Sequence, residues 1–138
     1  MYKLSISKIW FDESVIEIEI LAMNDNFSGK CKFYENDDDM IVLGKKIRGY
    51  PKSKEEIIEF QIGADNHLGK LTGKLENYNV HGKCKLTLEI IGSRDSISEN
   101  GYAKFPIIMW PSEIDELSNK LVDWKIKSLY NIIIENNE

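Results

Sequence analysis

Cys31, His67, His81 and Cys84 are the side chains of this chain best suited to bind a soft metal ion such as zinc. Structural zinc sites usually take their ligands in closely spaced pairs. Here only His81 and Cys84 lie close in sequence, and their odd separation places them on opposite faces of a strand. The alternation around both cysteines places the thiols inward, among apolar side chains. We therefore expect buried, unbridged cysteines and neither a metal nor a cofactor.

Nucleophilic catalysis would need an activated serine or cysteine. The sequence has no Gly-x-Ser-x-Gly elbow and no phosphate-binding Walker loop. A Cys–His pair would need an exposed thiol, against the pattern around Cys31 and Cys84. The sequence therefore predicts no enzyme and no catalytic residue. A small enzyme or small-ligand carrier, with a pocket between sheet and helices, stays open as the alternative.

A cluster of acidic side chains marks the predicted start of the first helix. Its members are Glu35, Asp37, Asp38 and Asp39. A calcium loop begun at Asp37 would put Val42 at the obligatory glycine and Arg48 at the bidentate glutamate, so it fails. Two interpretations remain. The acids stabilise the positive end of the helix dipole, or they form a ridge that meets a basic protein partner.

The net charge of −5 argues against a nucleic-acid binder, which needs a basic surface to displace phosphate counterions. The alternation expected in the strands turns lysines and glutamates outward together. These are Lys30, Lys32, Lys70, Lys74, Lys83 and Lys85, with Glu17, Glu19, Glu59 and Glu89. Opposite charges on neighbouring strands stabilise a sheet by about 0.2–1 kcal/mol per pair. We therefore expect a mixed, solvated face and no phosphate-binding patch.

The elements that must position these residues are mostly strands, because the dominant hydrophobic period is two. Ile16, Ile18 and Ile20 point one way while Glu17 and Glu19 point the other. Leu4, Ile6 and Trp10 predict a first strand on the same plan. Further strands are expected near residues 30–34, 57–62, 70–75, 83–90 and 103–110, and Pro106 favours an edge strand or a bulge in the last of them.

Two helices are predicted. The first runs from about Asp37 to Arg48, capped by Asn36 or Asp37, with Gly49 and Pro51 after its end. Its apolar stripe should dock on the sheet and consists of Met40, Leu43 and Ile47. The second starts at Ser112, and its helical spacing continues through Ile126 to Ile133. Whether this segment is one helix or two stays open.

The predicted fold is therefore α+β and a single domain over residues 1–138. We expect a mostly antiparallel sheet of about six to seven strands, with one short helix inserted after the third strand and a C-terminal helix. Both helices should pack on one face of the sheet. The sequence has no apolar run long enough for a membrane span and no signal-peptide pattern, so a cytoplasmic location is expected.

In the order of its elements, the chain resembles the bacterial immunity proteins of the WapI type and their uncharacterised relatives, over roughly residues 13 to 124. The segments that carry the resemblance are Ile16–Ile20, Phe27–Gly29, Ile47–Pro51, Glu59–Gly63 and Gly82–Leu86. Each of these segments is short.

Immunity proteins of this type neutralise polymorphic, contact-delivered toxins by binding them. The resemblance therefore implies a non-catalytic function and a protein partner, such as a basic toxin domain. It transfers no catalytic residues. Our candidates for the partner-binding surface are Glu35, Asp37, Asp38 and Asp39. No nucleic-acid or membrane partner is expected, and the oligomeric state stays open.

Overall fold

The computed structural model describes residues 1–63, 69–92 and 101–138. In this part of the chain the elements follow in the order β1 (Tyr2–Phe11), β2 (Ile16–Asn24), β3 (Ser28–Glu35), α1 (Asp37–Ile47), β4 (Ile58–Ile62), β5 (Lys70–Asn77), β6 (Cys84–Ile91), β7 (Tyr102–Met109), α2 (Pro111–Val122) and β8 (Tyr130–Asn136). The protein belongs to the α+β class, as predicted. The expected single sheet is wrong, because the strands form two antiparallel sheets of four, β3-β2-β1-β8 and β4-β5-β6-β7.

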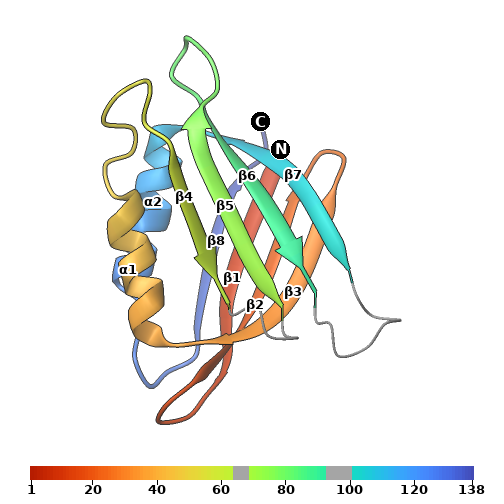
Figure 1. The fold of residues 1–138 in the computed structure, drawn as a ribbon, viewed down its shortest axis with the longest axis vertical. Coiled ribbons are helices and arrows are strands. Elements are labelled where there is room, and N and C mark those ends of the chain that lie inside the picture. Colours follow the sequence, from red (N-terminus) through yellow and green to blue (C-terminus); the bar gives the residue numbers. More distant parts are fainter. Residues whose placement is uncertain (64–68, 93–100) are drawn as a thin grey trace.

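The division into two sheets follows the course of the chain (Figure 1). Strands β1 to β3 pair as consecutive hairpins. The chain then passes through α1 and begins a second set of hairpins from β4 to β7. Finally β8 returns beside β1, with Ile6 opposite Ile132. A hydrophobic period of two in the sequence shows that each strand buries one face. It does not show to which sheet the strand belongs or what its buried face packs against.

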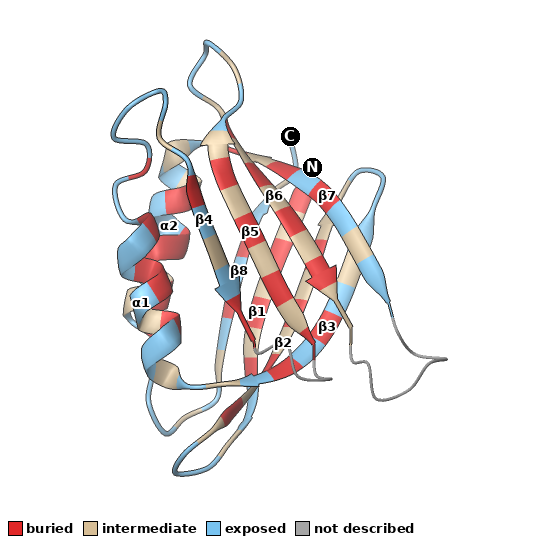
Figure 2. Cartoon of the chain, in the orientation of Figure 1, coloured by how far each residue is buried: buried red, intermediate tan, exposed pale blue. Residues whose placement is uncertain are grey.

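The core lies between the two sheets and the helices, where buried residues alternate with less buried ones along each strand (Figure 2). Ile18 and Ile20 of the first sheet and Leu88 and Ile107 of the second have no exposed surface. Cys31 and Cys84 are free and buried in this core, which confirms the prediction for the thiols.

Helices α1 and α2 pack against each other along the edges formed by β4 and β8 (Figure 1). Asn36 caps α1 by accepting a hydrogen bond from the backbone N–H of Asp39 at 2.8 Å. The predicted apolar stripe of α1 is confirmed, since Met40, Leu43 and Ile47 are all buried. The expected docking of both helices on one face of a single sheet is wrong, because α1 packs chiefly against α2 and the edge strand β4.

The second helix begins earlier and ends sooner than predicted. Pro111, which lacks a backbone N–H, occupies its first turn, and Ser112 follows it inside the helix. The side chain of Glu113 turns back and accepts a hydrogen bond from the backbone N–H of Trp110 at 2.8 Å.

The predicted helical continuation from Ile126 to Ile133 is wrong, because strand β8 begins at Tyr130. Ile132 and Ile134 are buried while Ile133 is exposed, so burial alternates with the period of two that is typical of a strand. A short run of isoleucines is compatible with a helix face or with a strand, and here the segment forms a strand because it pairs with β1.

The end of β1 also departs from the prediction. Lys8 continues the alternation of Leu4 and Ile6 and points into the protein, whereas a bulge that shifts the register between Lys8 and Trp10 turns Trp10 out. The outward lysines and glutamates are divided between the outer faces of two sheets. On the outer face of the first sheet, Oε2 of Glu19 lies 3.7 Å from Nζ of Lys30.

Strand β7, which contains Pro106, is an edge strand, as the proline indicated.

Candidate functional site

Three segments that are far apart in the sequence meet at one end of the molecule, at the bottom of Figure 1. They are residues 9–15 around the β1–β2 turn, residues 36–39 at the start of α1, and residues 123–129 between α2 and β8. We call this region the basal end. A cavity at this end is lined by two of the four predicted partner-binding carboxylates beside others from a different element.

The side chain of Lys8 holds these segments together. Its Nζ is buried and lies 2.9 Å from Oδ1 of Asp37, and it also donates to the backbone carbonyl of Lys125. The same Asp37 oxygen accepts a hydrogen bond from Nε1 of Trp124 at 2.5 Å. The ammonium group also lies 5.3 Å from the Trp124 ring centre. A buried charge is tolerated only when it is paired and hydrogen-bonded, and both conditions are met here.

An open cavity of about 280 Å³ lies at the basal end. Four of the residues that line it are carboxylates, Asp12, Glu13, Asp37 and Asp38. Its other lining residues, all in the described ranges, include no lysine or arginine; one of them is Ile126. Among the described residues, Asp37 is the one of these four that forms an ion pair, with the buried Lys8. The lining of the cavity therefore carries a net negative charge beside an apolar side chain.

Asp12 also shapes the turn between β1 and β2. Its Oδ1 accepts hydrogen bonds from the backbone N–H groups of Ser14 at 2.8 Å and of Val15 at 2.9 Å. These bonds hold the pKa of the Asp12 carboxyl below its ordinary value, because they stabilise the charged form. Asp12 is therefore a fixed negative charge at neutral pH.

The four acidic residues singled out from the sequence separate into two pairs. Asp37 and Asp38 line the basal cavity. Glu35 and Asp39 do not, and Glu35 instead accepts the backbone N–H of Gly63, at the end of β4, at 2.9 Å. Asp39 accepts a hydrogen bond from Nδ2 of Asn36 at 3.1 Å. Asp38 is thus the predicted candidate that is both exposed and in the cavity.

Burial raises the pKa of the Glu35 carboxyl above its ordinary value, and the nearby Asp39 carboxyl raises it further. Hydrogen bonds from the backbone of Gly63 and Asn36 act in the opposite direction, because they stabilise the carboxylate. This arrangement joins the end of β3 to the end of β4. Glu35 therefore has a structural role in the described part of the chain.

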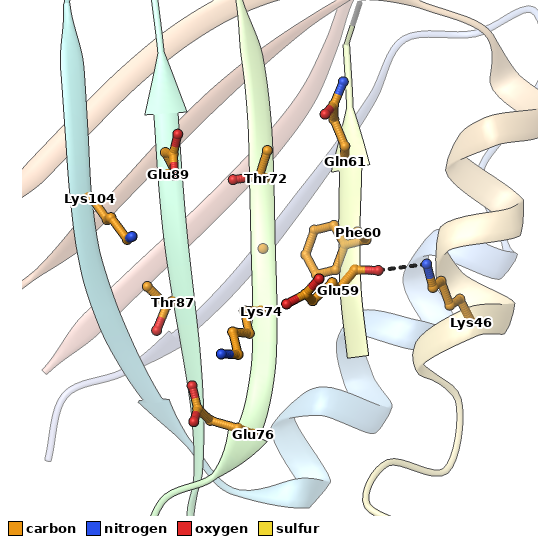
Figure 3. Close-up of a pocket in the computed structure, with 11 residues that line it drawn as sticks. Lys46, Glu59, Phe60, Gln61, Thr72, Lys74, Glu76, Thr87, Glu89 and Lys104 are labelled. Atoms are coloured by element: carbon orange, nitrogen blue, oxygen red, sulfur yellow. Dashed lines mark hydrogen bonds between the residues drawn. The ribbon is translucent and has the colours of Figure 1, made fainter. Parts of the chain in front are cut away.

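A second depression of about 680 Å³ covers the outer face of the second sheet, and we call it the outer dish (Figure 3). Strand register aligns its side chains in rows, with Glu59 opposite Lys74 and Glu89 opposite both Thr72 and Lys104. At its rim, Nζ of Lys46 donates to the backbone carbonyl of Glu59 at 2.6 Å.

The outer dish is balanced in charge. Its lysines are Lys46, Lys74 and Lys104, and its glutamates are Glu59, Glu76 and Glu89. Facing opposite charges of this kind stabilise a solvated sheet without attracting a partner of either sign. The outer dish therefore matches the mixed face expected from the sequence, and it gives no reason to choose one ligand class.

The residues considered for metal binding are dispersed. Burial raises the pKa of the Cys31 thiol to about 12 and also raises that of Cys84. His81 lies exposed in the β5–β6 turn, and His67 falls outside the described residues. Within the described ranges no three His, Cys, Asp or Glu side chains are placed to hold a metal ion together.

The helices in the described part of the chain are too short or too polar to cross a membrane.

Sequence reasoning missed Lys8, Asp12 and Glu13 as members of one site. The alternation of Leu4 and Ile6 does place Lys8 inward, but a lysine is almost never fully buried unless it is paired, and its partner Asp37 lies far away in the sequence. A signal existed at Asp12, since Asp-x-Ser before a strand is typical of a turn capped by an aspartate side chain. This turn lies close to the start of α1 only in the folded protein, so no local sequence pattern could predict that the two are neighbours.

Comparison of the chain with protein-family models, with curated proteins and with solved structures finds no match.

Proposed function

We propose that this protein is a non-catalytic binding protein, an immunity protein that neutralises a toxin domain by direct contact. The observation that supports the proposal best is the basal cavity, where Asp12, Glu13 and Asp38 supply negative charge without a neighbouring cation in the lining. Such a surface attracts a basic protein over a distance and speeds the formation of the complex. The sequence resemblance to WapI-type immunity proteins is the second support.

Inhibition by binding needs no reactive side chain in the inhibitor. It needs a stable interface, typically of about 1,200–2,000 Å², that covers or distorts a site on the toxin. The basal end combines negative charge, the exposed aliphatic side chains of Ile126 and Leu129, and segments fixed by a buried ion pair. A fixed surface loses little conformational freedom on binding, which favours affinity.

The alternative is a small enzyme or ligand carrier with a pocket between sheet and helices. The larger of the two depressions described above lies instead on the outer face of the second sheet and is charge-balanced. In the core, Met40, Ile47 and Leu121 fill the space between the helices and the sheets. We therefore prefer the binding function.

The test is co-expression with the toxin domain encoded beside this protein. We expect cells to survive, and the two purified proteins to form a stoichiometric complex without turnover or an added cofactor. Glu13→Gln combined with Asp38→Asn should slow association and weaken its dependence on salt. Asp37 should be left intact in this variant, because it pairs with the buried Lys8. If cells die as readily with the protein as without it, the immunity function is wrong for that toxin.

A further inference from the structure

Large apolar side chains are exposed on the segments that form the basal end, and one of them, Ile126, lines the basal cavity. The exposed fractions are 47% for Trp10, 60% for Ile126 and 64% for Leu129, while Ile9 reaches 36%. Single exposed apolar residues are ordinary on protein surfaces, but several together mark sites of interaction. Tryptophan in particular is enriched at the residues that dominate binding energy in protein interfaces.

The fold gathers these side chains for identifiable reasons. The bulge in β1 turns Trp10 out of the core. Pairing of Lys8 with Tyr130 brings Ile9 and Leu129, the next residues along, to the same end of neighbouring strands. The contact between Lys8 and the Lys125 carbonyl fastens the segment that carries Ile126. The apolar patch is thus built on the same anchor as the acidic cavity.

The charges around this patch are predominantly negative. Asp12, Glu13 and Asp38 are exposed, and Asp123 is exposed at the end of α2. Lys125 and Lys127, in the segment between α2 and β8, offset part of this negative charge. Nζ of Lys125 lies 6.0 Å from the Tyr130 ring centre. With Asp39, five exposed acids of the basal end stand against these two lysines, so the surface is net negative.

We infer that the basal end is the interface and that it receives a basic protein surface in which an apolar side chain lies beside a lysine or arginine. This inference rests on the proposed function. The apolar side chain packs against Trp10 and Ile126, where water is excluded and most of the binding energy arises. The cation reaches Glu13 and Asp38 at the rim, where charge mainly sets the association rate and the salt dependence.

The experiment measures association and dissociation rates between this protein and the toxin domain encoded beside it, at low and high salt. The apolar variant combines Trp10→Ser with Ile126→Ser, and the acidic variant combines Glu13→Gln with Asp38→Asn. The matched control for the apolar change is Tyr78→Ser with Val80→Ser, exposed side chains in the β5–β6 segment at the opposite end. The matched control for the acidic change is Glu59→Gln with Glu89→Gln in the outer dish.

The apolar variant should dissociate roughly tenfold faster or more, with little change in its association rate. The acidic variant should associate several-fold more slowly at low salt and match the wild type at high salt. Both controls should behave as the wild type. All four variants should unfold cooperatively near the wild-type urea midpoint, because none of the altered side chains is buried.

The possible failures separate the inference from the proposed function. If the toxin is bound and neutralised but only the outer-dish control weakens binding, the proposed function stands and the basal interface is overturned. If the wild type neither binds nor neutralises the toxin, the proposed function fails for that toxin, and the inferred partner falls with it. If sedimentation shows a dimer that the apolar variant dissociates, the patch belongs to a second copy of this chain, which also overturns the inference.

Discussion

The hydroxyl of Ser118 in α2 donates a hydrogen bond to the backbone carbonyl of Gly44 in α1 at 2.7 Å, and both residues are buried. A side chain at Gly44 would have no room, since its Cβ would lie 2.8 Å from Cβ of Leu121 and 2.8 Å from the backbone nitrogen of Val122. The two helices therefore approach closely at this glycine. Its poor helix propensity is offset by this contact.

Gly44→Ala should destabilise the protein although alanine favours helix by about 1 kcal/mol over glycine. The clash involves backbone of α2, so the helices must separate, and overpacking of this kind costs about 1–3 kcal/mol. Urea unfolding followed by circular dichroism measures the loss. Val42→Ala, at an exposed position of the same helix, should leave the midpoint nearly unchanged. A Gly44→Ala variant more stable than the wild type would show that the helices can move apart freely.

Much of the fold could be predicted from the sequence, because strand alternation and helix caps are local properties. Asn36 and the acids after it predicted the start of α1, and its stripe predicted the buried face. The division into two sheets depends on which faces meet across the core, which no local pattern contains. The isoleucines of β8 fitted either period, so only pairing with β1 revealed the strand.

The candidate site was less predictable for a related reason. Asp38 could be singled out from the sequence, because acidic residues at a helix start are recognisable there. Its neighbours in the basal cavity, Asp12 and Ile126, come from segments far away in the chain. The anchor that joins them, Lys8, is an inward-pointing lysine, and sequence patterns place lysine outward by default.

Asp37→Asn should destabilise the protein, because it leaves the buried Lys8 ammonium without its counter-charge. Removing one partner of a buried pair costs about 3–5 kcal/mol, and partial exposure of Asp37 places the expected loss near the lower value. Asp38→Asn is the matched control, one residue further along, and should change stability by less than about 0.5 kcal/mol. Equal urea midpoints for the two variants would contradict the importance of the ion pair.

Both cysteines should resist thiol reagents in the native protein. Burial raises the pKa of Cys31 to about 12 and raises that of Cys84 in the same direction, so little reactive thiolate forms at neutral pH. We expect slow labelling by a disulfide reagent in buffer and rapid labelling of two thiols in urea. The labelling rate in buffer should follow unfolding. Fast modification of either thiol in the folded protein would contradict its burial.

The Glu35 carboxyl should make stability depend on pH in a direction opposite to that of a salt-bridged acid. Its pKa in the folded protein is raised above the ordinary value of 4.5 by burial and by the Asp39 carboxyl. The folded state therefore binds the proton more tightly than the unfolded state, so protonation stabilises the fold. This contribution is fully present below the unfolded pKa and is lost as pH rises through the folded pKa. Glu35→Gln removes the titration and keeps one acceptor for a backbone N–H.

The difference in unfolding free energy between Glu35→Gln and the wild type should therefore shift in favour of the variant as pH rises from about 4 to about 7. Urea unfolding at several pH values measures this difference. Asp39→Asn, which removes the neighbouring charge, should reduce the pH dependence without abolishing it, because burial remains the larger cause. Asp38→Asn, in the same helical turn but absent from the causes of the shift, is the control and should leave the dependence unchanged. A difference that is constant across this range would show that Glu35 is charged and equally solvated in both states.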